Sequence, residues 1–154
     1  MSWPVRARGL ATPYPSLAPD APAEEAARLL ADEPVEGVFI QDQHGGLQGV
    51  VTDTTLLSFL LPRYLAEDRA LVGVLGEDVA DALWQRLRGR PVQELLAATT
   101  ASVAEVDADA TLVEVAATLV RTSASLVVVR DPGSQLRGGI TTSRLIAQLL
   151  GAPQ

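Results

Sequence analysis

The sequence predicts an α/β (α+β) fold in which two copies of a β-α-β-β-α unit pack sheet to sheet with pseudo-twofold symmetry and helices outside. The first observation is an internal repeat, because residues 18–61 align with residues 107–150 without a gap and 13 of the 44 positions are identical. The second is that helical spacing of apolar residues gives way in each copy to short β-branched runs. The third is size, since one copy alone is too small to bury both faces of its sheet.

Each copy is expected to begin with a short strand and a helix. The strands are placed near Ser16–Leu17 and near Ser102–Val106. The first helix is "PAEEAARLLADE", with Pro22 at a helix start, where its missing N–H costs nothing, and Pro34 closing it. Its counterpart "TLVEVAATLVRT" has apolar residues three and four apart, which indicates an amphipathic helix.

The remainder of each copy is expected to be a hairpin followed by a helix. The apolar strands "VFI" and "LVVV" lead into the turns "DQHGG" and "DPGSQ", which are rich in turn-forming residues. The return strands "LQGVV" and "LRGGI" end at a threonine, where a Leu-rich helix begins. The expected domains are therefore the first repeat over 1–61, a helical connector over 62–90 and the second repeat over 91–154.

The connector has a broken apolar face that predicts one or two amphipathic helices. Two interpretations of it remain open. It packs on its own repeat, or it offers a contact to a second copy or a partner, with Trp84 as the anchor.

Composition excludes several classes of protein. The chain has no cysteine and one histidine, His44, so no thiol nucleophile, Cys-based metal site or histidine cluster is available. A net charge of −7 argues against nucleic-acid binding. The N-terminal residues lack the apolar core of a signal peptide, and no apolar run is long enough to span a membrane. We therefore expect a cytoplasmic protein that is not inserted in a membrane.

Matching motifs in the two copies resemble the tandem CBS domain pair, or Bateman module, here as a stand-alone protein. The motifs are "GVFIQD" and "SLVVVRD", "GVVTDTTLL" and "GGITTSRLI", and the lead-ins "VRARGLAT" and "VQELLAAT". The resemblance implies adenosyl ligands (AMP, ADP, ATP or S-adenosylmethionine) in clefts between the repeats. It also implies control of a partner such as a transporter or an enzyme, and a homodimer formed through outer helices.

The strand-to-helix motif supplies the first candidate ligand residues. Thr52 and Thr141 stand where a threonine can cap a helix, contact a phosphate, or do both. Three residues later the family has an aspartate that binds ribose, and here the positions hold Thr55 and Arg144. Neither replacement offers a carboxylate, whereas Arg144 can pair with phosphate through its N–H groups or simply face solvent.

Further candidates come from alignment with the family. Ser125 aligns with a position that often lines the family's nucleotide cleft and whose first-copy counterpart is Glu36. Thr99 or Thr100 falls where the family often contacts adenosine. Residues 18–61 carry a net charge of −7 and residues 107–150 a net charge of 0, so a phosphorylated ligand is expected to prefer the second copy.

These patterns favour a regulatory module that senses an adenosyl nucleotide and acts on a partner protein in trans. The alternative is a CBS pair that has lost its ligand and serves in dimerisation or interaction, as the double loss of the ribose aspartate suggests. The sequence offers no catalytic constellation, so neither an enzyme nor a required cofactor or metal is expected.

Overall fold

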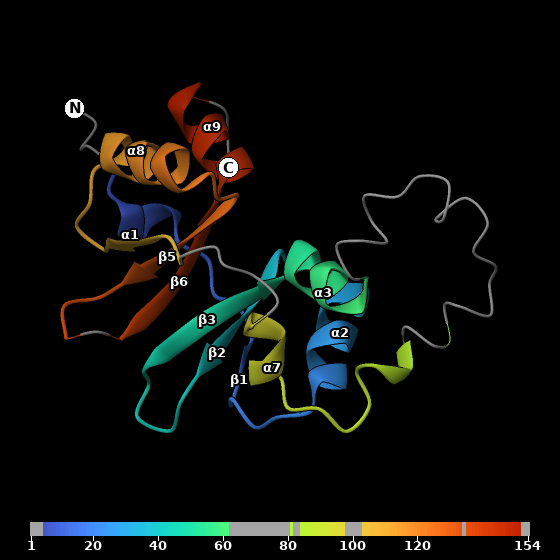
Figure 1. Cartoon of the computed structure of the whole chain (residues 1–154). Coiled ribbons are helices and arrows are strands. Elements are labelled where there is room, and N and C mark those ends of the chain that lie inside the picture. Colours follow the sequence, from blue (N-terminus) through green and yellow to red (C-terminus); the bar gives the residue numbers. More distant parts are fainter. Residues whose placement is uncertain (1–4, 62–80, 82–83, 98–102, 134, 152–154) are drawn as a thin grey trace, which may run out of the picture. The chain divides into compact units, whose positions relative to one another are not determined.

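Both copies fold as the same β-α-β-β-α unit in a computed structural model that describes residues 5–61, 81, 84–97, 103–133 and 135–151 (Figure 1). The mixed α/β class is therefore confirmed. The first copy comprises β1 (Ser16–Leu17), α2 (Ala23–Asp32), β2 (Gly37–Gln41), β3 (Leu47–Thr52) and α3 (Asp53–Leu60). The second comprises β4 (Glu105–Asp107), α8 (Leu112–Thr122), β5 (Leu126–Arg130), β6 (Leu136–Thr141) and α9 (Thr142–Leu149).

The two small sheets have the same topology and register. Their strand orders are β1-β2-β3 and β4-β5-β6, with the first pair parallel and the second pair antiparallel. Each hairpin shifts register at the same place, between Ile40 and Gln41 in one copy and between Val129 and Arg130 in the other. The duplication thus extends to a backbone irregularity that no residue pattern predicted.

The chain divides into two compact units that interleave along the sequence. The first-copy unit comprises Pro15–Gln43 and Leu47–Thr100, and the second-copy unit comprises Met1–Tyr14, His44–Gly46 and Ala101–Gln154. The domain boundaries expected at 1–61, 62–90 and 91–154 differ from these units, because they follow the order of the repeats along the sequence.

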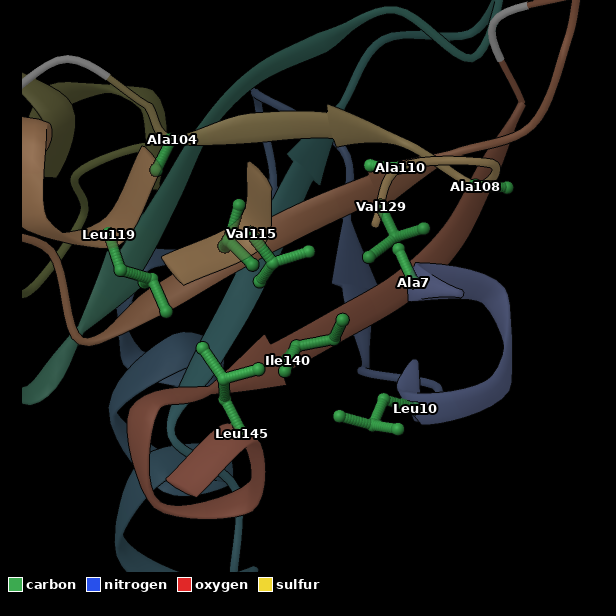
Figure 2. Close-up of a cluster of buried hydrophobic side chains, with 11 residues drawn as sticks. Ala7, Leu10, Ala104, Ala108, Ala110, Val115, Leu119, Val129, Ile140 and Leu145 are labelled. Carbon is green, nitrogen blue, oxygen red and sulfur yellow. The ribbon is translucent and has the colours of Figure 1, made fainter. Parts of the chain in front are cut away.

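Each unit has its own apolar core, built mostly from Ala, Val, Leu and Ile. Figure 2 shows the core of the second-copy unit, where the side chains of β5, β6, α8 and α9 meet those of the N-terminal helix α1 (Ala7–Leu10). The core of the first-copy unit joins α2, β2 and β3 to residues far along the chain: Leu87, Val92 and Leu95.

The N-terminal lead-in packs on the second copy. The backbone N–H groups of Ala7 and Arg8 donate to the carbonyls of Ala110 and Ala108, each over 2.9 Å. Thr12 then exchanges two backbone hydrogen bonds of 3.0 and 2.9 Å with Gly139 of β6. The lead-in is therefore part of the second-copy unit, although it stands directly before the first strand of the first copy.

The second lead-in packs on the first copy. Val92 and Gln93, at the start of α7 (Gln93–Leu96), donate their backbone N–H groups to the carbonyls of Ala21 and Pro19 over 2.7 and 3.0 Å. Ala21 and Pro19 are the repeat counterparts of Ala110 and Ala108. The two copies thus hold exchanged lead-ins through equivalent hydrogen bonds.

Part of the connector can be placed. Leu87 is completely buried in the core of the first-copy unit, whereas Trp84 is 41% exposed. Of the connector helices predicted over 62–90, residues 62–80, 82 and 83 lie outside the described residues. The strand expected over Ser102–Val106 is found at Glu105–Asp107. None of the helices in the described ranges is both long and apolar enough to cross a bilayer.

Candidate functional site

The turn from β6 into α9 brings three of the predicted residues together. Thr141 ends the strand and caps the helix, with its Oγ1 accepting the backbone N–H of Arg144 over 3.1 Å. Ser125 lies beside this turn, because its carbonyl accepts the backbone N–H of Thr142 over 3.0 Å. The sequence predicted the cap, and the structure confirms it.

The side chain of Arg144 has a partner that the sequence did not indicate. Its Nε donates to the carbonyl of Leu10, at the end of α1, over 2.6 Å. Arg144 is half-buried, and this bond leaves the Nη groups of its five-donor guanidinium for another acceptor. Arg144 therefore ties the exchanged lead-in to the strand-to-helix turn and holds a positive charge there.

Several donors remain at the start of α9. Among the described residues, the Ser143 backbone N–H makes no hydrogen bond. The Thr141 hydroxyl accepts from Arg144 and keeps its own proton to donate. These groups stand at the positive end of the helix dipole, where anions are stabilised. Sequence reasoning missed Ser143, although its place as the second residue after a cap is the signal that could have identified it.

The equivalent turn in the first copy is built differently. Thr52 caps α3 by accepting the Thr55 backbone N–H over 3.3 Å. The hydroxyls of Thr52 and Thr55 also lie 3.1 Å apart in a hydrogen bond, and Thr55 is only 6% exposed. Asp53 occupies the first turn of α3, whereas the first turn of α9 has no acidic residue. In the first-copy turn the two hydroxyls thus bond to each other, and the first helical residue is an exposed acid.

The other predicted residues contribute less to this geometry. Glu36, the counterpart of Ser125, is exposed just before β2. The Ser125 side chain is also exposed, so its carbonyl rather than its hydroxyl makes the contact with α9. Thr99 and Thr100 lie outside the described residues.

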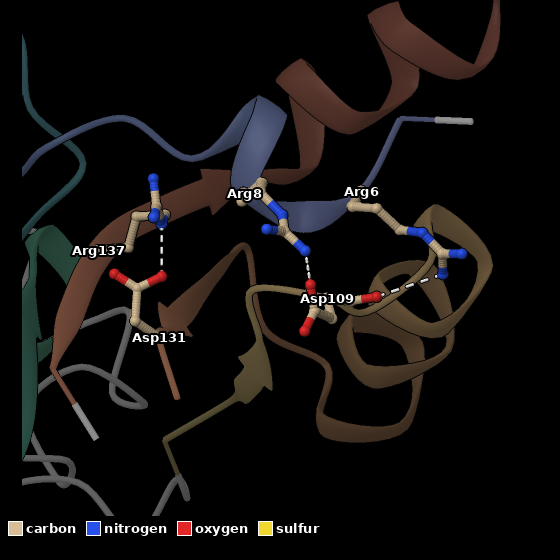
Figure 3. A network of polar contacts seen from close by, with 5 residues as sticks. All are labelled: Arg6, Arg8, Asp109, Asp131 and Arg137. Atoms are coloured by element: carbon tan, nitrogen blue, oxygen red, sulfur yellow. Dashed lines mark hydrogen bonds and ion pairs between the residues drawn. The ribbon is translucent and has the colours of Figure 1, made fainter. Parts of the chain in front are cut away.

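A hollow of about 380 Å³ in the second-copy unit has the opposite electrostatic character. It lies along β4 and the start of α8 and is lined by the carboxylates of Glu105, Asp107, Asp109 and Glu114. Figure 3 shows Asp109 paired with Arg8, while Arg6 donates to the Asp109 carbonyl over 3.3 Å. Figure 3 also shows the separate 2.7 Å ion pair of Arg137 with Asp131. Asp109 is paired with Arg8 and Glu105 with Arg130, but the lining itself has no basic residue, which disfavours a phosphate there and leaves the start of α9 as the candidate anion site.

Comparison with known proteins gives a family and a close structural match. The family model for the CBS domain matches residues 7–62. A crystal structure of a CBS domain-containing protein of unknown function from Kribbella flavida DSM 17836 is 32% identical, with a TM-score of 0.78. The match covers 95% of this chain and 99% of that one. No curated protein sequence matches significantly.

More distant structures share the fold. CBSX2, which is a CBS-pair protein of Arabidopsis thaliana, is 23% identical in its complex with AMP, with a TM-score of 0.66 and coverage of 96% and 97% of the two chains. The CBS domain of a bacterial CNNM/CorC family Mg²⁺ transporter is 16% identical, with a TM-score of 0.65 and coverage of 97% and 78%. With its two β-α-β-β-α units and its full-length match at 32% identity, this chain belongs to the CBS-domain family as a tandem CBS pair.

Proposed function

We propose that this protein is a regulatory module that binds an adenosyl nucleotide, such as AMP, ADP, ATP or S-adenosylmethionine, and acts on a partner protein in trans. The observation that carries the proposal is the start of α9, where the Thr141 hydroxyl, the Ser143 N–H and the Arg144 guanidinium offer donors to a phosphate. The AMP complex of CBSX2 and the transporter CBS domain supply the analogy for ligand and partner.

The ribose of such a ligand would need a different partner from the family's aspartate. Thr55 is buried and bonded to Thr52, and Arg144 has no acceptor atom. Recognition through phosphate is therefore the main source of affinity in this proposal, and nucleotides with a phosphate should bind more tightly than adenosine.

Calorimetric titration of the full chain with AMP, ADP, ATP and S-adenosylmethionine tests the proposal. We expect at least one phosphorylated ligand to bind, and the absence of binding by all of these ligands at millimolar concentration would refute it. Arg144→Ala is expected to weaken AMP about tenfold while adenosine changes little, since a charge-assisted bond to phosphate is lost. Thr55→Val is the matched control in the first copy, and equal losses for AMP and adenosine would contradict the phosphate role.

A second candidate function is a CBS pair that works only in dimerisation or interaction. It is favoured by large apolar side chains that are exposed on α8, on α9 and at the C-cap of α9 in the second-copy unit: Val113, Val120, Ile146, Leu149 and Leu150. Exposed apolar clusters of this kind mark protein–protein contacts. We propose that this face forms a homodimer in either case, and that the protein acts in the cytoplasm without a catalytic step.

Light scattering at low micromolar concentration measures the proposed dimer directly. Val120→Glu, a charge on an exposed position of α8, is expected to give a monomer with unchanged helical content. A wild-type monomer would contradict the homodimer. A thermal midpoint that ignores every nucleotide would favour the interaction function over the sensing function.

A further inference from the structure

The surface around residues 84–90 concentrates positive charge in an otherwise acidic unit. The stretch "WQRLRGR" places Trp84 and three arginines within seven residues, and all four side chains are exposed. Residues 18–61 of the same unit carry eight acidic side chains and one basic side chain. The three arginines therefore form a local positive cluster on an acidic unit, and such a cluster attracts anionic groups.

The stretch is anchored to the core of the unit. Leu87, in its middle, is completely buried among the side chains of α2, β2 and β3. Backbone bonds of 3.0 and 3.2 Å run from the N–H of Leu87 to the Trp84 carbonyl and from the N–H of Arg90 to the Leu87 carbonyl. Gly89 adopts a φ of +73°, which a side-chain-bearing residue rarely adopts, and so allows the turn.

Two of the arginines are held in place by an aromatic ring. The guanidinium carbons of Arg86 and Arg90 lie 5.7 and 5.9 Å from the centroid of the Phe59 ring, within the range of cation–π contacts. Arg90 also donates from Nε to the Arg86 carbonyl over 3.0 Å and pairs with Glu94 over 3.0 Å. Holding the guanidinium groups in advance reduces the entropy lost when a partner binds.

The ion pairs among the described residues leave two of the three arginines unused. Among the described residues, Arg86 and Arg88 have no acidic partner. A guanidinium that stacks on a ring keeps its N–H edge for hydrogen bonds, and that edge matches a carboxylate with two parallel bonds. Trp and Arg are also the residues that most often dominate binding energy at protein interfaces.

We propose that this arginine–tryptophan surface (Trp84, Arg86, Arg88 and Arg90) docks a carboxylate-rich segment of a partner protein. Charge complementarity favours an acidic partner, and a short segment extends over fewer of the acidic residues of the same unit than a long polymer does. A long nucleic acid would bring its phosphates against those residues and be repelled. The inference rests on the proposed regulatory function, because it states the chemistry of the partner that the protein would regulate. It does not require that a nucleotide binds.

The test titrates a short polyglutamate peptide into the full-length Trp3→Phe protein, in which Trp84 is the single tryptophan. We expect a saturable change in Trp84 fluorescence that weakens as salt is added, because exposed charges are screened. Arg86→Gln combined with Arg88→Gln is expected to weaken binding about tenfold, from the loss of two exposed ion pairs. Arg121→Gln, which removes an exposed arginine of α8, is the matched control and should leave the affinity unchanged.

Three results would overturn the proposal. They are no saturable binding of polyglutamate, equal affinity in the double variant, and tighter binding of single-stranded DNA at this surface than of the peptide. Circular dichroism of the double variant confirms that it folds, which is expected because both side chains are exposed. A protein that binds polyglutamate in this way but binds no nucleotide would refute the proposed sensing function and leave the docking surface standing.

Discussion

The two strand-to-helix turns share the same cap geometry but carry side chains of different charge. In the first copy, Thr52, Asp53 and Thr55 leave a part-buried hydroxyl pair and an exposed acidic residue at the start of α3. In the second, Thr141 and Arg144 leave a hydroxyl proton and a guanidinium at the start of α9. The same cap thus supports a turn with a negative side chain in one copy and a turn with a positive side chain in the other.

The difference teaches that two substitutions on a duplicated scaffold are enough to change the charge of an equivalent turn. The cap geometry is common to both, since each threonine accepts the backbone N–H three residues on. What differs is the charge at the first and third helical residues.

Replacing the strand glycines tests how differently the two exchanged lead-ins pack. A Cβ at Gly138, which has a φ of +155°, would lie 2.1 Å from the backbone carbonyl oxygen of Thr12. A Cβ at Gly49 would lie 2.8 Å from the flexible end of the Leu96 side chain. Gly138→Ala is expected to lower the free energy of unfolding by about 3 kcal/mol and Gly49→Ala by about 1 kcal/mol. Urea unfolding measures both, and equal losses would contradict the difference in packing.

Arg144→Thr gives the second-copy turn the residue of the first. The loss of the charged hydrogen bond to the Leu10 carbonyl is expected to lower the free energy of unfolding by about 2 kcal/mol. Hydrogen exchange should rise in residues 5–14, because the lead-in loses its tie to the turn. Arg144→Lys is the control for charge alone. Unchanged exchange in residues 5–14 of the Thr variant would show that Arg144 does not anchor the lead-in.

Removing the caps compares the two threonines directly. Thr141→Ala is expected to lower the free energy of unfolding by about 1 kcal/mol, the usual effect of losing a cap. Thr52→Ala should lower it by about 1.5 kcal/mol, because it also removes the partner of the buried Thr55 hydroxyl. The double variant Thr52→Ala with Thr55→Val removes both hydroxyls and should recover part of that difference. A larger loss for Thr141→Ala would reverse the comparison.

Thr142→Asp copies the first-copy carboxylate into the start of α9. Stability should change least here, with a gain of about 0.5 kcal/mol in the free energy of unfolding from the favourable helix dipole. The same charge is expected to weaken AMP binding about fivefold by repulsion of the phosphate. Calorimetry measures the affinity, with Thr142→Asn as the neutral control. Unchanged affinity for AMP in the Asp variant would place the phosphate away from α9.

Local patterns predicted the elements of each copy well. The helical spacing in "TLVEVAATLVRT" corresponds to α8 at Leu112–Thr122, and its Thr111 and Glu114 form a reciprocal capping box. The caps at Thr52 and Thr141 were also predictable, because a threonine before a Leu-rich run is a local signal. Ser143 was accessible to the same reasoning but was not identified.

Long-range contacts were not accessible in this way. The bond from Arg144 to the Leu10 carbonyl joins residues 134 positions apart, and neither residue carries a local sign of it. The burial of Thr55 likewise depends on how α3 lies on its own sheet. Residue patterns describe a segment's own preferences and not its neighbours in space.

By itself, the sequence determined that this protein is a duplicated β-α-β-β-α unit with threonine-capped helices, because periodicity and capping act within a few residues. Only the tertiary structure decided that the lead-ins are exchanged between the copies and that Arg144 holds one of them. The physical reason is that backbone N–H and carbonyl groups pair with whichever segment packing brings near. The 2.9 Å bonds from Ala7 to Ala110 and from Arg8 to Ala108 therefore follow from the packing of the core and from no local motif.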